Sequence, residues 1–183
     1  MMLLIILVVA VAFIYGMSMQ GVTCCNSGSM FALVKAIVEK GKVSINEFMK
    51  YTKGIDYAKR GDKYYSDRAP GSSFAAVPFY YLGLNVTLVS VISGVLSSGL
   101  VYLIAMKLVN NEIIAFSTGL IFAFCTINWR YSTLFLIHSL STFLVLLAVY
   151  GLFVNFPAIV IGLILGIATM VEYTDAVYLF GIV

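Results

Sequence analysis

Long apolar runs joined by short polar links make up most of this chain. A helix needs about 20 apolar residues to cross a bilayer, and the runs come close to that length. The pattern predicts an all-α polytopic membrane protein with five to six transmembrane helices. The expected spans are residues 2–19, 84–109, 113–128, 132–153 and 156–172, with residues 174–183 opening a sixth. Because the later links are short, neighbouring spans are expected to run antiparallel.

The first apolar run, residues 2–19, suits either a signal peptide or a retained span. It has no basic stretch at its start and no clean small-residue cleavage site. A retained first transmembrane helix is therefore favoured. In the fifth span, Gly162 and Gly166 have the spacing that lets two helices approach closely. We interpret this spacing as plain helix packing.

Residues 20–83 interrupt the apolar pattern and are expected to form a folded loop outside the bilayer. Residues 20–72 hold nine of the eleven Lys and Arg residues and five of the eight Asp and Glu residues. Between Met30 and Gly41 the apolar positions recur with helical spacing. This spacing predicts an amphipathic helix at the membrane surface, with Lys35 and Glu39 on its polar face.

Three further signals subdivide this loop. Ser44 and Glu47 are spaced as a capping box, which would open a second short helix. The turn at Arg60–Asp62 lies between alternating segments and predicts a small hairpin. Pro70 begins a tyrosine-rich interfacial helix. The expected organisation is a first helix (1–19), a folded loop with juxtamembrane helices (20–83) and a helical bundle (84–183).

Composition supports the membrane assignment and limits the candidate chemistry. Charged residues make up 10% of the chain, against about 25% in soluble domains, and the mean hydropathy is +1.03. The net charge of +3 is too small and too localised to indicate nucleic-acid binding. A disulfide between the adjacent Cys24 and Cys25 would be strained. No His or Cys spacing indicates a metal site, and no cofactor is indicated; the loop carboxylates could bind a divalent metal, but no spacing demands it.

Alternating spans would gather the remaining ionisable residues on the side of the membrane that carries the loop. Arg130 would lie there at the end of the third span, and Glu172 at the end of the fifth. His138 would lie near the start of the fourth span. Ionisable groups at a membrane edge are costly and indicate function, although helix ends also carry charges for solvation alone. Asp67 precedes the point where the chain enters the membrane and could act as a general base. The adjacent Arg68 could hold a phosphate.

Four segments follow one another in a recognisable order. NSGSMFALVKAIVEKGKVSINE comes first, GDKYYSDRAPGSSFAAVPFYYLG second, and the spans WRYSTLFLIHSLSTFLVLLAVYGL and GLILGIATMVEYTDAV complete the series. In this order the chain resembles the N-terminal part of the GT-C glycosyltransferases, which include protein O-mannosyltransferases and lipid A aminoarabinose transferases. A motif of that superfamily, similar to D-K-P-P-G, is matched by Asp67 to Gly71.

The resemblance implies transfer of a sugar, with inversion, from a polyprenyl-phosphate donor to an acceptor outside the cytoplasm. It implies Asp67, or otherwise Asp56, as the catalytic base, and Arg68, Arg130 and Glu172 as substrate-binding residues. Two further residues complete the predicted substrate-binding set: Asn26, near the place of the family's acidic pair, and His138, near the start of the fourth span. It also places the loop 20–72 on the extracytoplasmic side of the plasma membrane. Charge alone would place this basic loop in the cytoplasm. The implied partners are membrane lipid and the lipid-linked sugar donor.

Two departures from the family pattern keep other functions open. The usual acidic pair after the first span is absent, and Asn26 and Ser27 stand near that place; Asn cannot act as a base. Ala69 replaces one proline of the motif. The alternative is a non-catalytic accessory or structural subunit of a larger membrane complex, with partner membrane subunits. A small transporter or lipid-binding module is a third hypothesis, with His138 as its intramembrane group.

Overall fold

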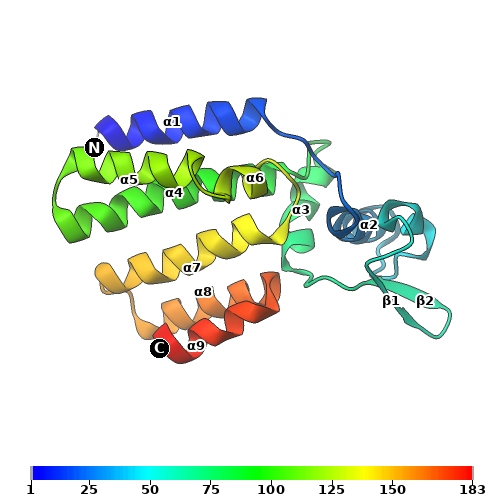
Figure 1. Ribbon diagram of the computed structural model, residues 1–183. Coiled ribbons are helices and arrows are strands. Elements are labelled where there is room, and N and C mark those ends of the chain that lie inside the picture. The colour runs from blue at the N-terminus through cyan, green and yellow to red at the C-terminus, as the bar shows by residue number, and fades with distance from the viewer. Residues whose placement is uncertain (1, 183) are drawn as a thin grey trace.

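Two groups of helices lie crosswise to each other in the computed structural model, which describes residues 2–182 (Figure 1). One group is a bundle whose helices run back and forth along a common direction. Its members are α1 (Met2–Met17), α4 (Leu88–Val109), α5 (Glu112–Phe124), α6 (Asn128–Ser132), α7 (Ile137–Phe153), α8 (Ala158–Val171) and α9 (Ala176–Ile182). A short 3₁₀ turn, η2 (Tyr173–Asp175), joins α8 to α9. The chain is therefore mostly helical, as its apolar pattern predicts.

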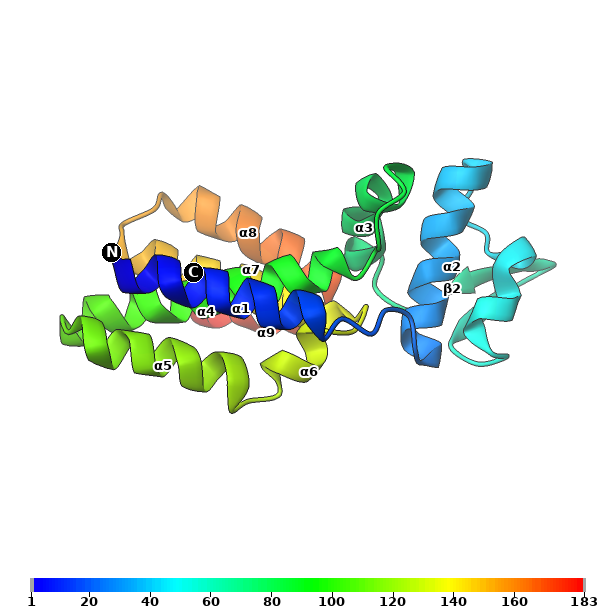
Figure 2. The same ribbon diagram turned by 90° about the horizontal axis from the view of Figure 1, so that it is seen from above.

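The second group, residues 20–83, covers one end of the bundle and is called the cap. It contains α2 (Cys25–Lys40), the 3₁₀ helix η1 (Asn46–Thr52), the strands β1 (Tyr57–Arg60) and β2 (Lys63–Ser66), and α3 (Gly71–Tyr81). Seen from above, α3 lies next to the bundle, α2 lies beyond it, and the hairpin lies farthest out (Figure 2). The cap end of the bundle also carries α6 and the start of α7. The alternating course of the chain thus gathers the polar segments at one end.

The bundle helices are shorter than the sequence predicts. Among the described residues 2–182, α4 is the one helix that is both long and apolar enough to cross a bilayer by itself. The helices α1, α5, α7 and α8 have 16, 13, 17 and 14 residues. Helices of this length reach about 20–26 Å, less than the roughly 30 Å of a bilayer core. The expectation of helices is confirmed, whereas five or six full-length spans are not seen.

Hydrogen bonds between distant segments explain why the fourth expected span loses its first residues. The fourth was expected to begin at residue 132, but α7 begins at Ile137. Gln20 N–H donates to the carbonyl of Thr133 at 2.8 Å, and Phe135 N–H donates to that of Gly21 at 3.2 Å. These bonds flank a parallel bridge between Gly21 and Leu134, and residues 133–136 lie outside both α6 and α7. The prediction missed them because the partners are more than 100 positions apart in sequence.

Buried polar side chains form a connected network in the centre of the bundle. The hydroxyl of Tyr15 in α1 donates to the carbonyl of Ala123 in α5 at 2.6 Å and accepts from Asn128 Nδ2 in α6 at 3.0 Å. Ser132 lies 3.4 Å from Asn128 Oδ1 and 3.2 Å from the hydroxyl of Ser139 in α7. An unpaired polar group costs about 1–3 kcal/mol when buried. The network therefore fixes α6 between three longer helices.

Small residues allow the bundle helices to approach closely, but at other positions than predicted. A Cβ added at Gly94 would lie 1.9 Å from Ser132 Oγ, and one at Gly119 would lie 2.5 Å from Leu7 Cδ2. At Gly162 and Gly166, by contrast, an added Cβ would meet no heavy atom within 4 Å. The two glycines of the predicted packing motif do not pack within residues 2–182.

The cap is organised around Lys35, which the sequence placed on a solvated helix face. Its ammonium group lies 5.1–5.8 Å from the ring centroids of Phe31, Phe48, Tyr51 and Tyr80. It also donates to the Tyr80 hydroxyl at 2.7 Å and pairs with Glu39, and its side chain is only 15% exposed. The rings come from α2, η1 and α3, so one cation holds three elements together.

The short helix after α2 also begins differently from the prediction. Ser44 and Glu47 were expected to form a capping box, but the residue before the first turn of η1 is Ile45. The apolar side chain of Ile45 makes no hydrogen bond to the start of the helix. Ser44 Oγ donates to Asn46 Oδ1 at 2.5 Å, and Glu47 pairs with Lys40 at 2.8 Å. The hairpin prediction is confirmed, with Gly61 at a positive φ of 59° in its turn.

Replacing Gly28 by Ala is expected to lower the melting temperature of the protein strongly. The added Cβ would lie 1.9 Å from the backbone oxygen of Tyr51, so α2 and η1 would have to separate. Overpacking of this kind costs about 1–3 kcal/mol or more. Gly162→Ala is the control, because it gains about 0.5–1 kcal/mol of helix propensity without a clash. Equal melting temperatures for the two variants would contradict this packing.

The stability of the cap is expected to decrease in acid through Glu39. Lys35, and secondly Tyr80, hold the pKa of Glu39 below its usual 4.5. A carboxylate with a lowered pKa stabilises the fold above its unfolded pKa, and this contribution disappears as the pH falls through the folded pKa. Thermal melts between about pH 5 and 3 should therefore show a smaller decrease for Glu39→Gln than for the wild type. In a protein that carries Lys35→Met, adding Glu39→Gln should leave the loss of stability in acid unchanged. A double-mutant cycle measures this coupling between Lys35 and Glu39.

Candidate functional site

The guanidinium group of Arg68 gathers polar side chains from three parts of the cap. Its Nη2 lies 2.8 Å from Asp56 Oδ1 and 2.8 Å from Asn26 Oδ1, and its Nε lies 3.5 Å from Asp67 Oδ1. Asn26 belongs to the first turn of α2, Asp56 precedes β1, and Asp67 follows β2. Four of the residues singled out in the sequence, Asn26, Asp56, Asp67 and Arg68, thus lie together.

The hairpin explains why two carboxylates eleven residues apart meet at one arginine. Tyr57 pairs with Ser66 at the open end of the hairpin, so the residues just outside this pair are neighbours. Ser66 Oγ lies 2.8 Å from Ser29 Oγ, which joins the base of the hairpin to α2. Ser66 Oγ also accepts from Arg68 N–H at 3.3 Å and so orients the chain as it leaves β2.

The two carboxylates differ in how strongly they are held. Asp56 makes a short ion pair with Arg68, and its side chain is 19% exposed. Asp67 is 33% exposed, and its Oδ1 lies 3.5 Å from both Arg68 Nε and Ser29 Oγ. Arg68 Nε is buried and makes no hydrogen bond within the described residues, so its contact with Asp67 is one of charge alone. Asp67 is therefore the more exposed and the less firmly paired of the two carboxylates.

A hollow of about 290 Å³ lies beside Arg68. Phe74 of α3 and Leu33 of α2 give it apolar walls, and Tyr173 closes it from the end of the bundle. An apolar hollow with one guanidinium group suits a ligand that joins an anionic group to a hydrocarbon.

A second cavity, of about 440 Å³, lies in the bundle near the cap and contains two of the predicted substrate-binding residues. His138 Nδ1 lies 3.1 Å from Glu172 Oε2, and the ring of Tyr131 packs on the imidazole with the centroids 4.5 Å apart. Ser141 Oγ donates to Asp175 Oδ2 at 2.7 Å, and Asp175 is 5% exposed. No Lys or Arg lines this cavity within the described residues.

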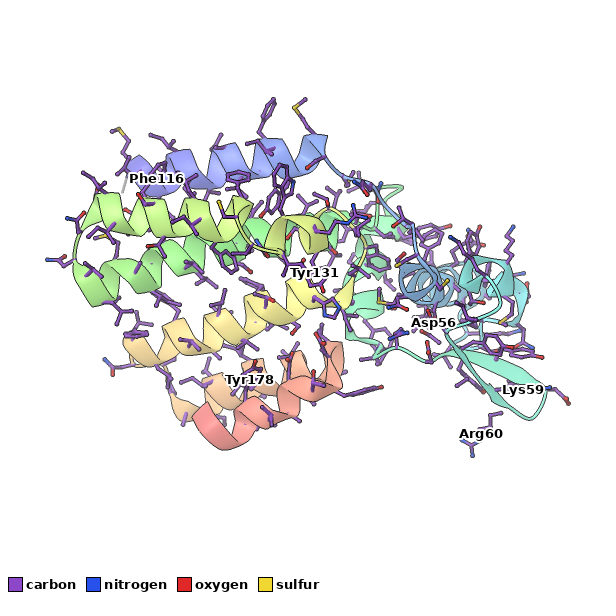
Figure 3. The ribbon with its side chains drawn as sticks, viewed as in Figure 1. Asp56, Lys59, Arg60, Phe116, Tyr131 and Tyr178 are labelled. Atoms are coloured by element: carbon purple, nitrogen blue, oxygen red, sulfur yellow. The ribbon has the colours of Figure 1, made fainter. Side chains whose placement is uncertain are left out.

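Of the residues that line this cavity, His138 and Glu172 were predicted as site residues, whereas Tyr131, Ser141 and Asp175 were not. A signal for two of them is present in the sequence. Ser141 follows His138 by three positions, which places both on one face of α7. Asp175 likewise follows Glu172 by three positions, within the turn around η2. Figure 3 shows Tyr131 at the cap end of the bundle and Asp56 beyond it, in the cap.

The segment between α8 and α9 lies between the two clusters. Tyr173 lines the hollow beside Arg68, whereas Glu172 and Asp175 line the bundle cavity. At the same junction α3 approaches α8 closely, because a Cβ added at Gly71 would lie 2.7 Å from the carbonyl oxygen of Met170. The two clusters therefore share one end of the molecule.

Arg130, the remaining predicted substrate-binding residue, lies apart from both clusters. Its Nη1 donates to Gln20 Oε1 at 2.7 Å and so ties α6 to the segment that follows α1. Neither the hollow beside Arg68 nor the bundle cavity includes it. The structure thus gives Arg130 a structural contact outside the candidate site.

No family model matches the chain, and neither a curated protein nor a solved structure matches it. The resemblance to GT-C glycosyltransferases therefore rests on the quoted motifs and enters below as part of a proposal. Within residues 2–182, no group of three or more His, Cys, Asp or Glu side chains is placed to hold a metal ion.

Replacing Arg68 by Lys is expected to loosen the base of the hairpin although the charge is kept. A lysine has one nitrogen, so it cannot contact Asn26 and Asp56 with one group and face Asp67 with another, as Nη2 and Nε of Arg68 do. Hydrogen bonds to charged groups contribute about 1.5–3 kcal/mol. Limited proteolysis should then cut faster between residues 53 and 68. Arg60→Lys, at the exposed tip of the hairpin, is the matched control. Equal cleavage rates in the two variants would show that Arg68 does not hold this junction.

Proposed function

We propose that this chain is a membrane-embedded glycosyltransferase, or the part of one that carries the catalytic base. It transfers a sugar, with inversion, from a polyprenyl-phosphate donor to an acceptor hydroxyl outside the cytoplasm. The observation that carries the proposal is the Arg68 cluster. A guanidinium group and an accessible carboxylate lie within 3.5 Å of each other, in a cap that lies crosswise at one end of an apolar bundle.

The outer surface of the bundle supports insertion into a membrane. The exposed positions of α1 include Ile5, Val9 and Phe13, which are 59–66% exposed, and those of α8 include Ile159 and Leu163, at 73% and 64%. These residues recur at every fourth position and form continuous apolar stripes. Contiguous exposed apolar surface is rare on soluble monomers and is the usual surface of helices that face lipid.

In the proposed reaction, Arg68 binds the phosphate of the donor and Asp67 accepts the proton of the acceptor hydroxyl. The hydroxyl oxygen forms a bond to the anomeric carbon on the face opposite the phosphate. The bond between this carbon and the phosphate oxygen breaks, and its electron pair leaves with the polyprenyl phosphate. Arg68 stabilises the charge on this leaving group. The proton that Asp67 takes up balances the reaction.

This mechanism gives the two loop carboxylates different roles. Asp56, at 2.8 Å from Arg68 Nη2, orients the guanidinium group as a positioning residue. The same nitrogen donates to Asn26 Oδ1 at 2.8 Å, so an uncharged side chain also holds the guanidinium group in place. The sequence left the base assignment between Asp56 and Asp67 open, and the geometry favours Asp67 because it is more accessible and less firmly paired.

Asp67→Asn is expected to reduce sugar transfer about 10²-fold or more, which is the usual contribution of a general base. The assay uses membranes that contain the protein, a short-chain polyprenyl-phosphate sugar and labelled acceptor. Asp62→Asn, in the exposed hairpin turn, is the control and should keep full activity. Melting temperatures show whether each variant is folded.

Two results would overturn parts of this proposal. If Asp67→Asn transfers sugar normally, Asp67 is not the base. If the wild-type protein transfers no sugar but purifies with a stoichiometric membrane partner, the chain is a non-catalytic accessory or structural subunit.

A further inference from the structure

The ion pairs of the cap leave a group of basic residues without acidic partners. Lys35, Lys40 and Arg68 pair with Glu39, Glu47, Asp56 and Asp67. The six other basic residues of the cap make no ion pair within residues 2–182, and Asp62 is the only acidic residue left in residues 20–72. These six are Lys42, Lys50, Lys53, Lys59, Arg60 and Lys63.

Five of these residues lie in or beside η1 and the hairpin, whereas the ammonium group of Lys53 donates to the carbonyl of Thr23, just before α2, at 3.1 Å. All six are exposed and fall between positions 42 and 63, in η1, the hairpin and their connections. Figure 2 shows α2 between these elements and the bundle. Lys59 and Arg60 lie at the hairpin, the part of the cap farthest from the bundle (Figure 3). We call the surface formed by the other five basic residues (Lys42, Lys50, Lys59, Arg60 and Lys63) the outer basic face.

The outer basic face contains one open strand edge. The outer side of β2 is covered, because Ile45 N–H donates to the carbonyl of Tyr64 and Asn46 bonds to the backbone of Asp62 and of Tyr64. On its other side β1 has no strand partner within the described residues, and all four of its residues are exposed. Its outward N–H and C=O groups are therefore free to pair with another extended chain.

Charged side chains on an edge strand are a common protection against aggregation. Here β1 itself carries Lys59 and Arg60, and further basic residues of the outer basic face lie beside the strand. Arg60 and Lys63 are also directly opposite each other across the hairpin. Like charges in this position are destabilising, and a bound anionic group would relieve their repulsion. Free backbone groups and excess positive charge together match an extended chain that carries carboxylates.

We infer that the outer basic face binds an acidic polypeptide segment in extended form, which adds as a third strand to the free edge of β1. Backbone hydrogen bonds would give the interaction its geometry, and the lysines and arginine would select acidic side chains. This inference uses neither Asp67 nor the hollow beside Arg68, and it does not depend on the proposed transferase activity.

The experiment uses the full chain in nanodiscs of zwitterionic lipid, so that lipid charge does not contribute. The probe is a fluorescent L-glutamate peptide of about eight residues, the length of an ordinary strand, and binding is measured by anisotropy at about 0.15 M salt. The double substitution Lys59→Glu and Arg60→Glu should weaken binding about tenfold or more. Lys107→Glu, at the opposite end of the bundle, is the matched control and should leave binding unchanged.

The mirror-image D-glutamate peptide separates strand addition from charge attraction. It has the same charge, but its preferred twist is opposite to that of an L-strand, so it should bind at least several-fold more weakly. Equal binding of the two peptides, or equally tight binding of dextran sulfate, would overturn the polypeptide assignment and indicate a general polyanion surface. Absence of L-peptide binding would overturn the inference altogether. Melting temperatures check that the charge-reversed variant remains folded.

Discussion

The position of the candidate base depends on the fork of one guanidinium group. Arg68 contacts the first turn of α2 through Asn26 and the base of the hairpin through Asp56, and α3 begins three residues after it. The hydrogen bond between Ser29 and Ser66 joins the same helix and hairpin. An arginine can donate hydrogen bonds to several oxygen atoms at once. A single side chain therefore sets the relative positions of a helix start, a hairpin and the connection to the bundle. Asp67 is held next to it by chain connectivity, with little direct bonding, and this leaves its carboxylate accessible.

A second constraint acts inside the bundle, where polar groups cannot be left unpaired. Tyr15, Asn128 and Ser132 form a chain of hydrogen bonds that ends at Ser139, beside the bundle cavity. These bonds fix α6 and therefore the ring of Tyr131, which packs on His138. The polar residues of the bundle thus have two connected effects: they hold short helices in place, and they give the cavity its shape.

The sequence predicts what local patterns can determine. The apolar runs locate the bundle helices, the alternation around Gly61 locates the hairpin, and Asp67 with Arg68 stands out as a charged pair at the entry to an apolar segment. Contacts between distant residues are not visible in such patterns. The rings around Lys35 come from positions 31, 48, 51 and 80, so an apparently solvated lysine is enclosed. For the same reason, the pairing of residues 20–21 with 133–135, which shortens α7, could not be foreseen.

The two clusters differ in charge, and this difference would determine the orientation of a substrate that occupied both. The hollow beside Arg68 has a guanidinium group and apolar walls, whereas the cavity at His138 and Glu172 has two carboxyl groups and, within the described residues, no Lys or Arg. A phosphate would be repelled from the cavity and attracted to Arg68. Tyr173 lies between them, and its neighbours Glu172 and Asp175 face the cavity side. A ligand with one anionic and one uncharged end would therefore have a single favourable orientation across this junction.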